Sequence, residues 1–316
     1  MRKTFKSQML SAAVMLVVAA VALTGATYAW FSNIADPSVG TLDLQVAADD
    51  SLFISSYDTA LASEVTGDKW RASVSQSEIN TAQSGVFSGV MKDVSTVGTD
   101  AYHDFFRTSG FLSTMKPESY TAATLGSDYV RFTFWVRSSK DASMFLNGGA
   151  ADPLTSQLSY VVAADSAGTP LNHFAATDTD RQQPQYAIAY TVRIAFVPLV
   201  DTSTPGTFEV EDWTGAVIWE PNSDLHLAID QGGPGGTDVI PTDSAVKTAG
   251  PAGTAGVDDG VQPAVDFTGG KLTLGSLLAG RLYRYAVYMW VEGSDPDTVN
   301  AVANSYFQAH LRFGAE

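Results

Sequence analysis

Segments rich in alternating or β-branched residues constrain the fold of this chain more than any other feature. Apolar and polar side chains alternate along residues 129–137 and 305–313, and residues 186–198 and 281–292 are long, β-branched and aromatic. Successive side chains of a strand point to opposite faces, so alternation indicates a half-buried strand. Pro198 is expected to end its strand, because proline has no N–H for the ladder. Shorter strands are predicted at 40–46, 51–55, 144–146, 158–162, 216–219 and 272–278.

Composition supports a folded β protein and excludes several classes. Of the 316 residues, 45% are hydrophobic and only 16% are charged, which excludes an intrinsically disordered chain. The absence of cysteine excludes disulfides, thiolate zinc sites, iron–sulfur clusters and cysteine catalysis. A net charge of −16 argues against a nucleic-acid partner, since phosphate binding needs clustered basic side chains. We therefore predict an all-β, mainly antiparallel sandwich.

Two stretches lack the strand pattern. Residues 56–127 are polar and mixed, and are predicted to be a long insertion with one or two short helices. One such helix is expected over 99–108, where Tyr102, Phe105 and Phe106 would share a face. Residues 231–270 hold ten Gly and four Pro, which predicts a mobile loop. Residues 296–304 begin Pro-Asp, which is typical of a short helix.

The first 29 residues have the pattern of an export signal. Three basic residues precede an apolar run over 12–23, and small residues follow it. Twelve residues rise about 18 Å as a helix, short of the ~30 Å hydrocarbon core. Small side chains permit cleavage after Ala26 or after Ala29, and we favour the bond between Ala29 and Trp30. The alternative is an uncleaved anchor over 9–29.

The junction after this signal resembles a known family. It reads Thr-Gly-Ala-Thr-Tyr-Ala-Trp-Phe-Ser-Asn-Ile over 24–34, and Gly-Thr-Leu-Asp-Leu follows at 40–44. This stretch of about twenty residues resembles the TasA/camelysin family of exported bacterial proteins. The chain departs from the family in placing Ala26 between Gly25 and Thr27, and Asn33 where an Asp is usual. A weaker resemblance to clostridial-type relatives lies at 285–297, and the middle of the chain resembles nothing we can name.

The resemblance implies a fold, a protease and an assembly. The fold is a jelly-roll-like β-sandwich, here with long loop insertions and a few short helices. The protease is a dedicated signal peptidase, and the assembly is an extracellular fibre of the biofilm matrix. Some relatives have been classed as metallopeptidases.

Motifs for catalysis are missing from the sequence. The four histidines, His103, His173, His226 and His310, lie more than thirty residues apart, and no His-Glu-x-x-His occurs. No Gly-x-Ser-x-Gly turn or phosphate-binding glycine loop is present either. Paired carboxylates such as Asp49-Asp50 are usually solvated surface residues in an acidic protein, so they do not indicate a glycosidase site. We therefore predict that the protein is not an enzyme and has no cofactor, with a secreted hydrolase as the weakest alternative.

One acidic cluster suggests a cation. Glu292, Asp295, Asp297 and Asn300 place three carboxylates and an amide within nine residues, and oxygen ligands of this kind suit Ca²⁺. The alternative is turn chemistry, since Asp-Pro is a common turn pair and Asp297 would stabilise a helix start.

The predicted function is a secreted structural subunit of a cell-surface filament. After cleavage, residues 30–38 would form an extended arm ahead of one domain over 39–316, and no membrane segment would remain. The apolar side chains Trp30, Phe31 and Ile34 suit donation of this arm to the open sheet edge of the next copy. Head-to-tail donation propagates as a fibre, so the main partner is the protein itself. The alternatives are an arm folded back on a monomer, and a monomeric surface binding or adhesion module that uses its loops.

Overall fold

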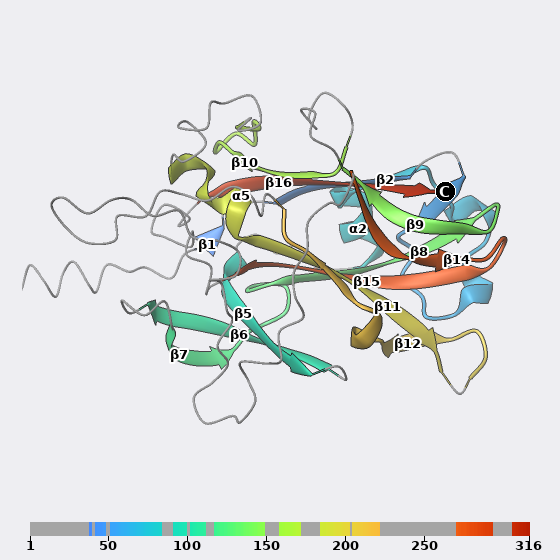
Figure 1. The fold of residues 1–316 in the computed structure, drawn as a ribbon, viewed down its shortest axis with the longest axis horizontal. Helices are drawn as coiled ribbons and strands as arrows, with labels where there is room; N and C mark the ends of the chain where they lie inside the picture. Colours follow the sequence, from blue (N-terminus) through green and yellow to red (C-terminus); the bar gives the residue numbers. More distant parts are fainter. Residues whose placement is uncertain are drawn as a thin grey trace, which may run out of the picture. The chain divides into compact units, whose positions relative to one another are not determined.

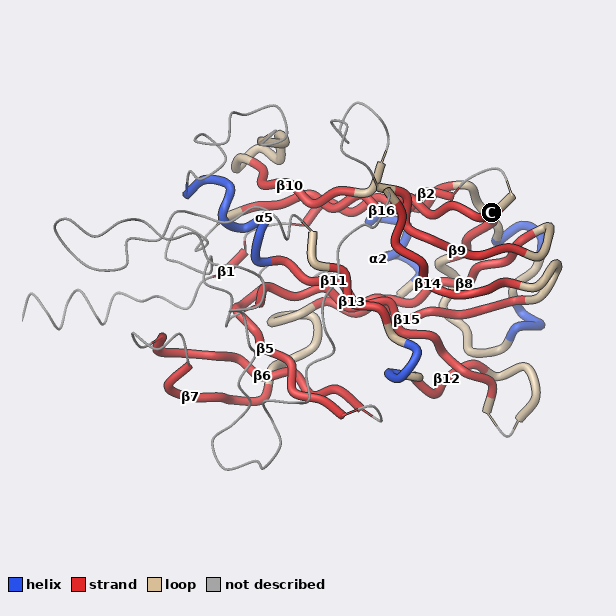
Figure 2. The backbone as a smooth tube through the Cα atoms, in the orientation of Figure 1, coloured by secondary structure: helices blue, strands red, loops and turns tan. Residues whose placement is uncertain are grey.

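Most of the residues that the structure describes are in β-strands (Figure 1). The computed structural model describes residues 38–39, 42–48, 51–83, 91–99, 102–111, 117–148, 158–171, 184–202, 204–221, 270–292 and 305–316. They belong to one compact unit, residues 37–316, and form two sheets. The helical segments are short (Figure 2): η1 (Ala62–Glu64), η2 (Gly67–Lys69), α2 (Gln76–Ala82), η4 (Pro184–Tyr186), α5 (Ala187–Thr191) and η5 (Trp213–Gly215). The predicted all-β, mainly antiparallel fold class is confirmed.

The first sheet is organised around β15 (Leu282–Glu292). On one side β15 pairs antiparallel with β8 (Val130–Ser138), and on the other with β11 (Val192–Asp201). Beyond β8 lies β3 (Leu52–Ser55), and beyond β11 lie β12 (Phe208–Glu211) and β13 (Val217–Trp219). The segments 129–137 and 281–292 are therefore neighbouring central strands, as their patterns predict.

A three-stranded extension joins the end of β15. There β5 (Met91–Thr99) runs parallel to β15 at two positions and continues into β6 (Tyr102–Phe111) and β7 (Pro117–Ala122). The short β1 (Ser38–Val39) also pairs with β5. The helix predicted over 99–108 is wrong, since this segment belongs to the β5–β6 hairpin. Aromatics three and four apart fit a helix face, but Phe105 instead stacks on Tyr129 at 4.3 Å between ring centroids.

The second sheet is organised around β16 (Tyr306–Ala315). β16 runs parallel to β2 (Leu42–Ala48), and its other side pairs antiparallel with β10 (Tyr160–Ala164) and β9 (Ala142–Asn147). The edges are β4 (Ser73–Ser75) beside β2 and β14 (Lys271–Leu277) beside β9. Because the two sheets include parallel pairs, the jelly-roll description stays a prediction.

The two sheets pack face to face around a shared hydrophobic core. Phe313 of β16 contacts Phe134 of β8 and Phe196 of β11, at 5.1 and 5.9 Å between ring centroids. The alternating residues of β16 lie in this core as predicted: Phe307, Ala309, Leu311 and Phe313. The opposite face of the first sheet is also covered, by a cluster that includes Trp213 and Trp290. The protein is thus a β-sandwich with an additional layer of packing on one sheet.

The strand predicted over 186–198 is only partly right. Residues 187–191 form the buried helix α5, and β11 begins at Val192 and passes through Pro198 to Asp201. Pro198 does not end the strand, because its C=O accepts the N–H of Asp212 and so faces away from β15. The N and C=O of a strand residue point to the same side, so the missing N–H leaves the ladder with β15 intact.

Several predicted features lie outside the described residues. These are the export signal 1–29, nearly all of the arm 30–38, all but the last residue of the loop 231–270, and the helix 296–304. Within the described part of the chain, no helix is long and apolar enough to span a membrane.

Candidate functional site

The candidate site lies where β3 ends beside the helix α2. This helix begins at a capping box: the N–H of Glu78 donates to Ser75 Oγ at 3.4 Å, and the N–H of Ser75 donates to the Glu78 carboxylate at 2.8 Å. These bonds satisfy donors that a helix start leaves unpaired. The buried Ile79 holds the helix against the core.

Gln83, the C-cap of α2, fixes the helix to the sheet. Its Oε1 accepts the N–H of Thr133 at 2.7 Å, and its Nε2 donates to the C=O of Thr133 and, at 3.0 Å, to the C=O of Ser56. The last residue of β3, Ser55, pairs with Trp135 of β8. Thr133 lies two residues before Trp135 in the sequence, which is where the antiparallel β3 would pair if it continued. The amide of Gln83 therefore makes the two main-chain bonds that a continuing β3 strand would make.

Arg71 is fixed against β3 from the other side. Its N–H and C=O exchange hydrogen bonds with Ile54 at 2.8 and 3.0 Å. Its guanidinium Nη1 donates to the C=O groups of Asp68 and Trp70 at 2.6 and 3.0 Å. The main chain and one end of the guanidinium are thus both held in place.

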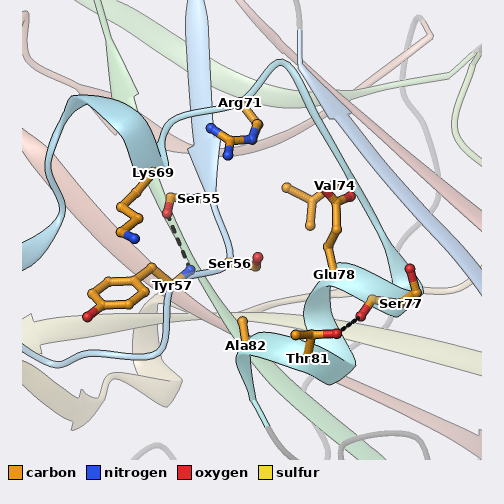
Figure 3. A pocket seen from close by; sticks show the side chains of 10 residues that line it. All are labelled: Ser55, Ser56, Tyr57, Lys69, Arg71, Val74, Ser77, Glu78, Thr81 and Ala82. Carbon is orange, nitrogen blue, oxygen red and sulfur yellow. Dashed lines mark hydrogen bonds between the residues drawn. The ribbon is translucent and has the colours of Figure 1, made fainter.

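Between these elements is a pocket of about 390 Å³ (Figure 3). Its walls combine two cations, one carboxylate, five hydroxyl groups and two apolar side chains: Lys69, Arg71, Glu78, Ser55, Ser56, Tyr57, Ser77, Thr81, Val74 and Ala82. In Figure 3, Arg71 lies across the pocket from Thr81 and Ala82 of α2. Polar groups of both signs therefore converge on one space from three separate segments.

The charges in and beside the pocket are partly compensated. Lys69 Nζ lies 3.5 Å from a carboxylate oxygen of Asp68 and 5.0 Å from the centroid of the Tyr57 ring. Hydrogen bonds from Ser75 lower the pKa of Glu78, so this side chain is a carboxylate at neutral pH. A hydrogen bond from Thr66, followed by the charge of Lys69, lowers the pKa of Asp68. The arrangement suits a ligand with one negative charge and several hydroxyl groups better than a strongly charged ligand.

A second polar cluster lies on the outer face of the first sheet. Glu211 Oε1 accepts hydrogen bonds from Arg131 Nη2 at 2.8 Å and Tyr288 Oη at 2.7 Å, and Oε2 accepts from Trp213 Nε1 at 3.1 Å. Burial raises the pKa of Tyr288 above its ordinary value. This network joins β8, β12, η5 and β15, and we assign it to stability.

Of the predicted cation ligands, only Glu292 is among the described residues. It is buried, and its Oε2 accepts the indole N–H of Trp290 at 3.0 Å. Asp295, Asp297 and Asn300 lie outside the described residues, so the calcium site stays a prediction. Elsewhere in the described residues, no group of three His, Asp or Glu side chains could hold a metal ion.

The other predicted residues are placed as follows. Ala29, Trp30, Phe31 and Ile34 lie outside the described residues. His310 is buried on β16, with Nδ1 at 3.0 Å from the C=O of Leu158, and burial lowers its pKa. It is a strand histidine.

The comparisons with known proteins do not identify the chain or the pocket. No family model matches the sequence, and neither curated proteins nor solved structures give a match. The sequence did not predict the pocket, because its residues come from a polar stretch whose apolar side chains recur at neither a helix nor a strand period. The capping box Ser75-Gln-Ser-Glu78 was the available signal for α2.

Proposed function

We propose that this protein is a secreted structural subunit of an extracellular filament, similar to the TasA/camelysin family. A dedicated signal peptidase would remove residues 1–29, and the part of the arm that precedes Ser38, residues 30–37, would then add as a strand to the next copy. The supporting sequence is the junction described above, with Trp30, Phe31 and Ile34 just after the cleavage site. No catalytic step is required, and assembly uses backbone pairing and apolar burial.

The register of β1 is the observation that carries this proposal. Ser38 pairs with Lys92, so an antiparallel continuation towards the N-terminus would meet Asp93 and then Val94 of β5. Val94 is already paired on both sides, with Glu292 of β15 and Arg107 of β6. Only Asp93 therefore separates the part of β5 that pairs with β1 from Val94, where both sides of β5 are occupied. If the residues before Ser38 formed a longer strand, it would have to pair at a different sheet edge, and the next copy could offer one.

The pairing of the described strands is consistent with a separable arm. The core between the sheets includes Phe134, Phe196 and Phe313 of the described residues. Its two central strands, β15 and β16, each have neighbours on both sides. We therefore expect the domain to fold without residues 30–36.

Electron microscopy of the purified mature protein tests the proposal. The full mature chain should form filaments, and a variant lacking residues 30–36 should stay monomeric with an unchanged β-type circular dichroism spectrum. Ile34→Asp should weaken assembly, because it places a charge in an apolar groove at a cost of several kcal/mol. Asn33→Asp is the matched control: it adds the same charge one residue away, where the family usually has Asp, and should still assemble.

Three results would overturn the mechanism. The first is unfolding of the monomer on deletion of the arm, which would place the arm in its own core. The second is equal loss of filaments in both charge variants, and the third is filaments that persist without the arm. A mature protein that stays monomeric under all conditions would favour the surface binding module instead.

A further inference from the structure

We propose that the pocket between β3 and α2 binds a hexuronic acid, a six-membered sugar ring with one carboxylate. The proposal is independent of filament assembly, since it uses only residues 55–82. It rests on the combination of a held arginine, hydroxyl groups, and a carboxylate that limits the charge of the ligand.

Arg71 supplies the site for the ligand carboxylate. Guanidinium binds carboxylate through two parallel N–H groups, and it binds best when its position is fixed beforehand. Nη1 is occupied by the C=O groups of Asp68 and Trp70, and in the described part of the chain Nε and Nη2 have no hydrogen-bonding partner. Nε and Nη2 lie on one edge of the guanidinium fork, which is the edge that bidentate binding uses. Lys69 adds a second positive charge to the wall.

Hydroxyl groups and a carboxylate oxygen line the rest of the pocket. Thr81 Oγ1 donates to the C=O of Ser77 at 2.7 Å, so its oxygen can still accept. Ser55 Oγ accepts the N–H of Tyr57 at 3.3 Å, so its hydroxyl can still donate. Glu78 receives both of its bonds from Ser75 on Oε2, and Oε1 remains an acceptor for a sugar hydroxyl. Val74 and Ala82 offer apolar contact to the C–H groups of the ring.

The charge balance separates this ligand from stronger anions. Lys69 and Arg71 are opposed by Glu78 in the wall and by Asp68 beside it. A phosphate dianion would meet the Glu78 carboxylate without a surplus of cations, whereas a monocarboxylate needs only Arg71. The pocket volume of about 390 Å³ falls at the lower end of the ~300–1,000 Å³ range of ligand sites, which suits one sugar ring. With few fixed contacts, we expect a Kd on the order of 1 mM.

Titration of the ¹⁵N-labelled mature protein carrying Ile34→Asp, which should weaken assembly, with sodium glucuronate tests the proposal by NMR. The amides of 55–57 and 77–82 should shift and give one Kd, while glucose and inorganic phosphate should bind at least ten times more weakly. Arg71→Gln should weaken glucuronate at least tenfold. Lys69→Gln should weaken it less, and circular dichroism should show that both variants are folded. Arg281→Gln, a cation of the β14–β15 turn outside the pocket, is the matched control and should bind as the parent does.

A short α-1,4-linked galacturonate oligomer distinguishes the source of the sugar acid. Shifts of the same amides by the oligomer would identify a unit of a polysaccharide. Exclusion of the oligomer, with glucuronate bound, would identify a free sugar acid. Equal affinity for glucose would overturn the role of Arg71, and tighter binding of phosphate would overturn the charge argument. Absence of shifts at 55–57 and 77–82, or an unchanged Kd in Arg71→Gln, would overturn the site itself.

Discussion

Replacing Gln83 by Ala should destabilise the protein by several kcal/mol, although the residue is a helix C-cap in a polar segment. The side chain of Gln83 is 7% exposed, and Thr133 is 2% exposed. The substitution removes the partner of the Thr133 N–H and C=O together, as well as a bond to the Ser56 C=O. A buried polar group left without a partner costs about 1–3 kcal/mol. Two such groups on Thr133 give about 2–6 kcal/mol, towards the lower end if water enters.

Equilibrium unfolding in urea, followed by tryptophan fluorescence, measures this free energy. Thr81→Ala is the control on the same helix, because Thr81 is exposed and its change should stay within about 0.5 kcal/mol. Hydrogen exchange adds a local test: the Thr133 amide should lose protection in Gln83→Ala. A change in the free energy of unfolding below about 0.5 kcal/mol, with Thr133 still protected, would refute the reasoning.

Gln83→Glu is a second, sharper variant. The new carboxylate can accept the Thr133 N–H but cannot donate to the two C=O groups while it is ionised. Protonation restores a donor, so the folded state should raise the pKa of this carboxyl. Stability should therefore be recovered as the pH falls and lost as it rises. Equal destabilisation at all pH values would show that the donor bonds contribute little.

Two further predictions concern polar groups on β15 and its neighbours. Glu211→Gln should lower the free energy of unfolding by about 1–3 kcal/mol, because it weakens charge-assisted bonds to Arg131 and Tyr288. Glu209→Gln, at an exposed position of the same strand, should change it little in the same urea assay; equal effects would contradict a specific network. Burial raises the pKa of Tyr285 to about 12, above about 10 in the unfolded chain, so its contribution is fully present below pH 10 and lost as the pH rises to 12. The loss should be roughly 2–3 kcal/mol by unfolding titration, and Tyr285→Phe should abolish that part of the pH dependence. An unchanged pH profile in Tyr285→Phe would refute the assignment.

The central strands were predictable because each has one face in the sandwich core. Alternation in 129–137 and 305–313 places Phe134 and Phe313 on the facing sides of two sheets. The pattern failed over residues 187–191, which are all buried, so their apolar run has no period to separate helix from strand. It also failed at 99–108, where aromatic spacing suited a helix but pairing with β5 prevailed.

The candidate site could not be predicted in the same way. Its position depends on four hydrogen bonds to main-chain groups, two between Gln83 and Thr133 and two between Arg71 and Ile54. Where polar side chains follow no helix or strand period, the sequence does not show which distant residues they will bond to. Only the capping box at Ser75 had a recognisable local form.

The order of the strands along the chain has a consequence for the timing of folding. β15 separates β8 from β11, and β16 separates β2 from β10, yet β15 and β16 come after all the other described strands in the sequence. Neither sheet can complete its central pairing until residues 282–315 have been made. Pairing between such distant segments is intrinsically slow, because a long loop must close before the contacts form. Until these residues are available, each sheet lacks the strand that joins its two halves, so the earlier strands cannot complete the two faces that enclose the core.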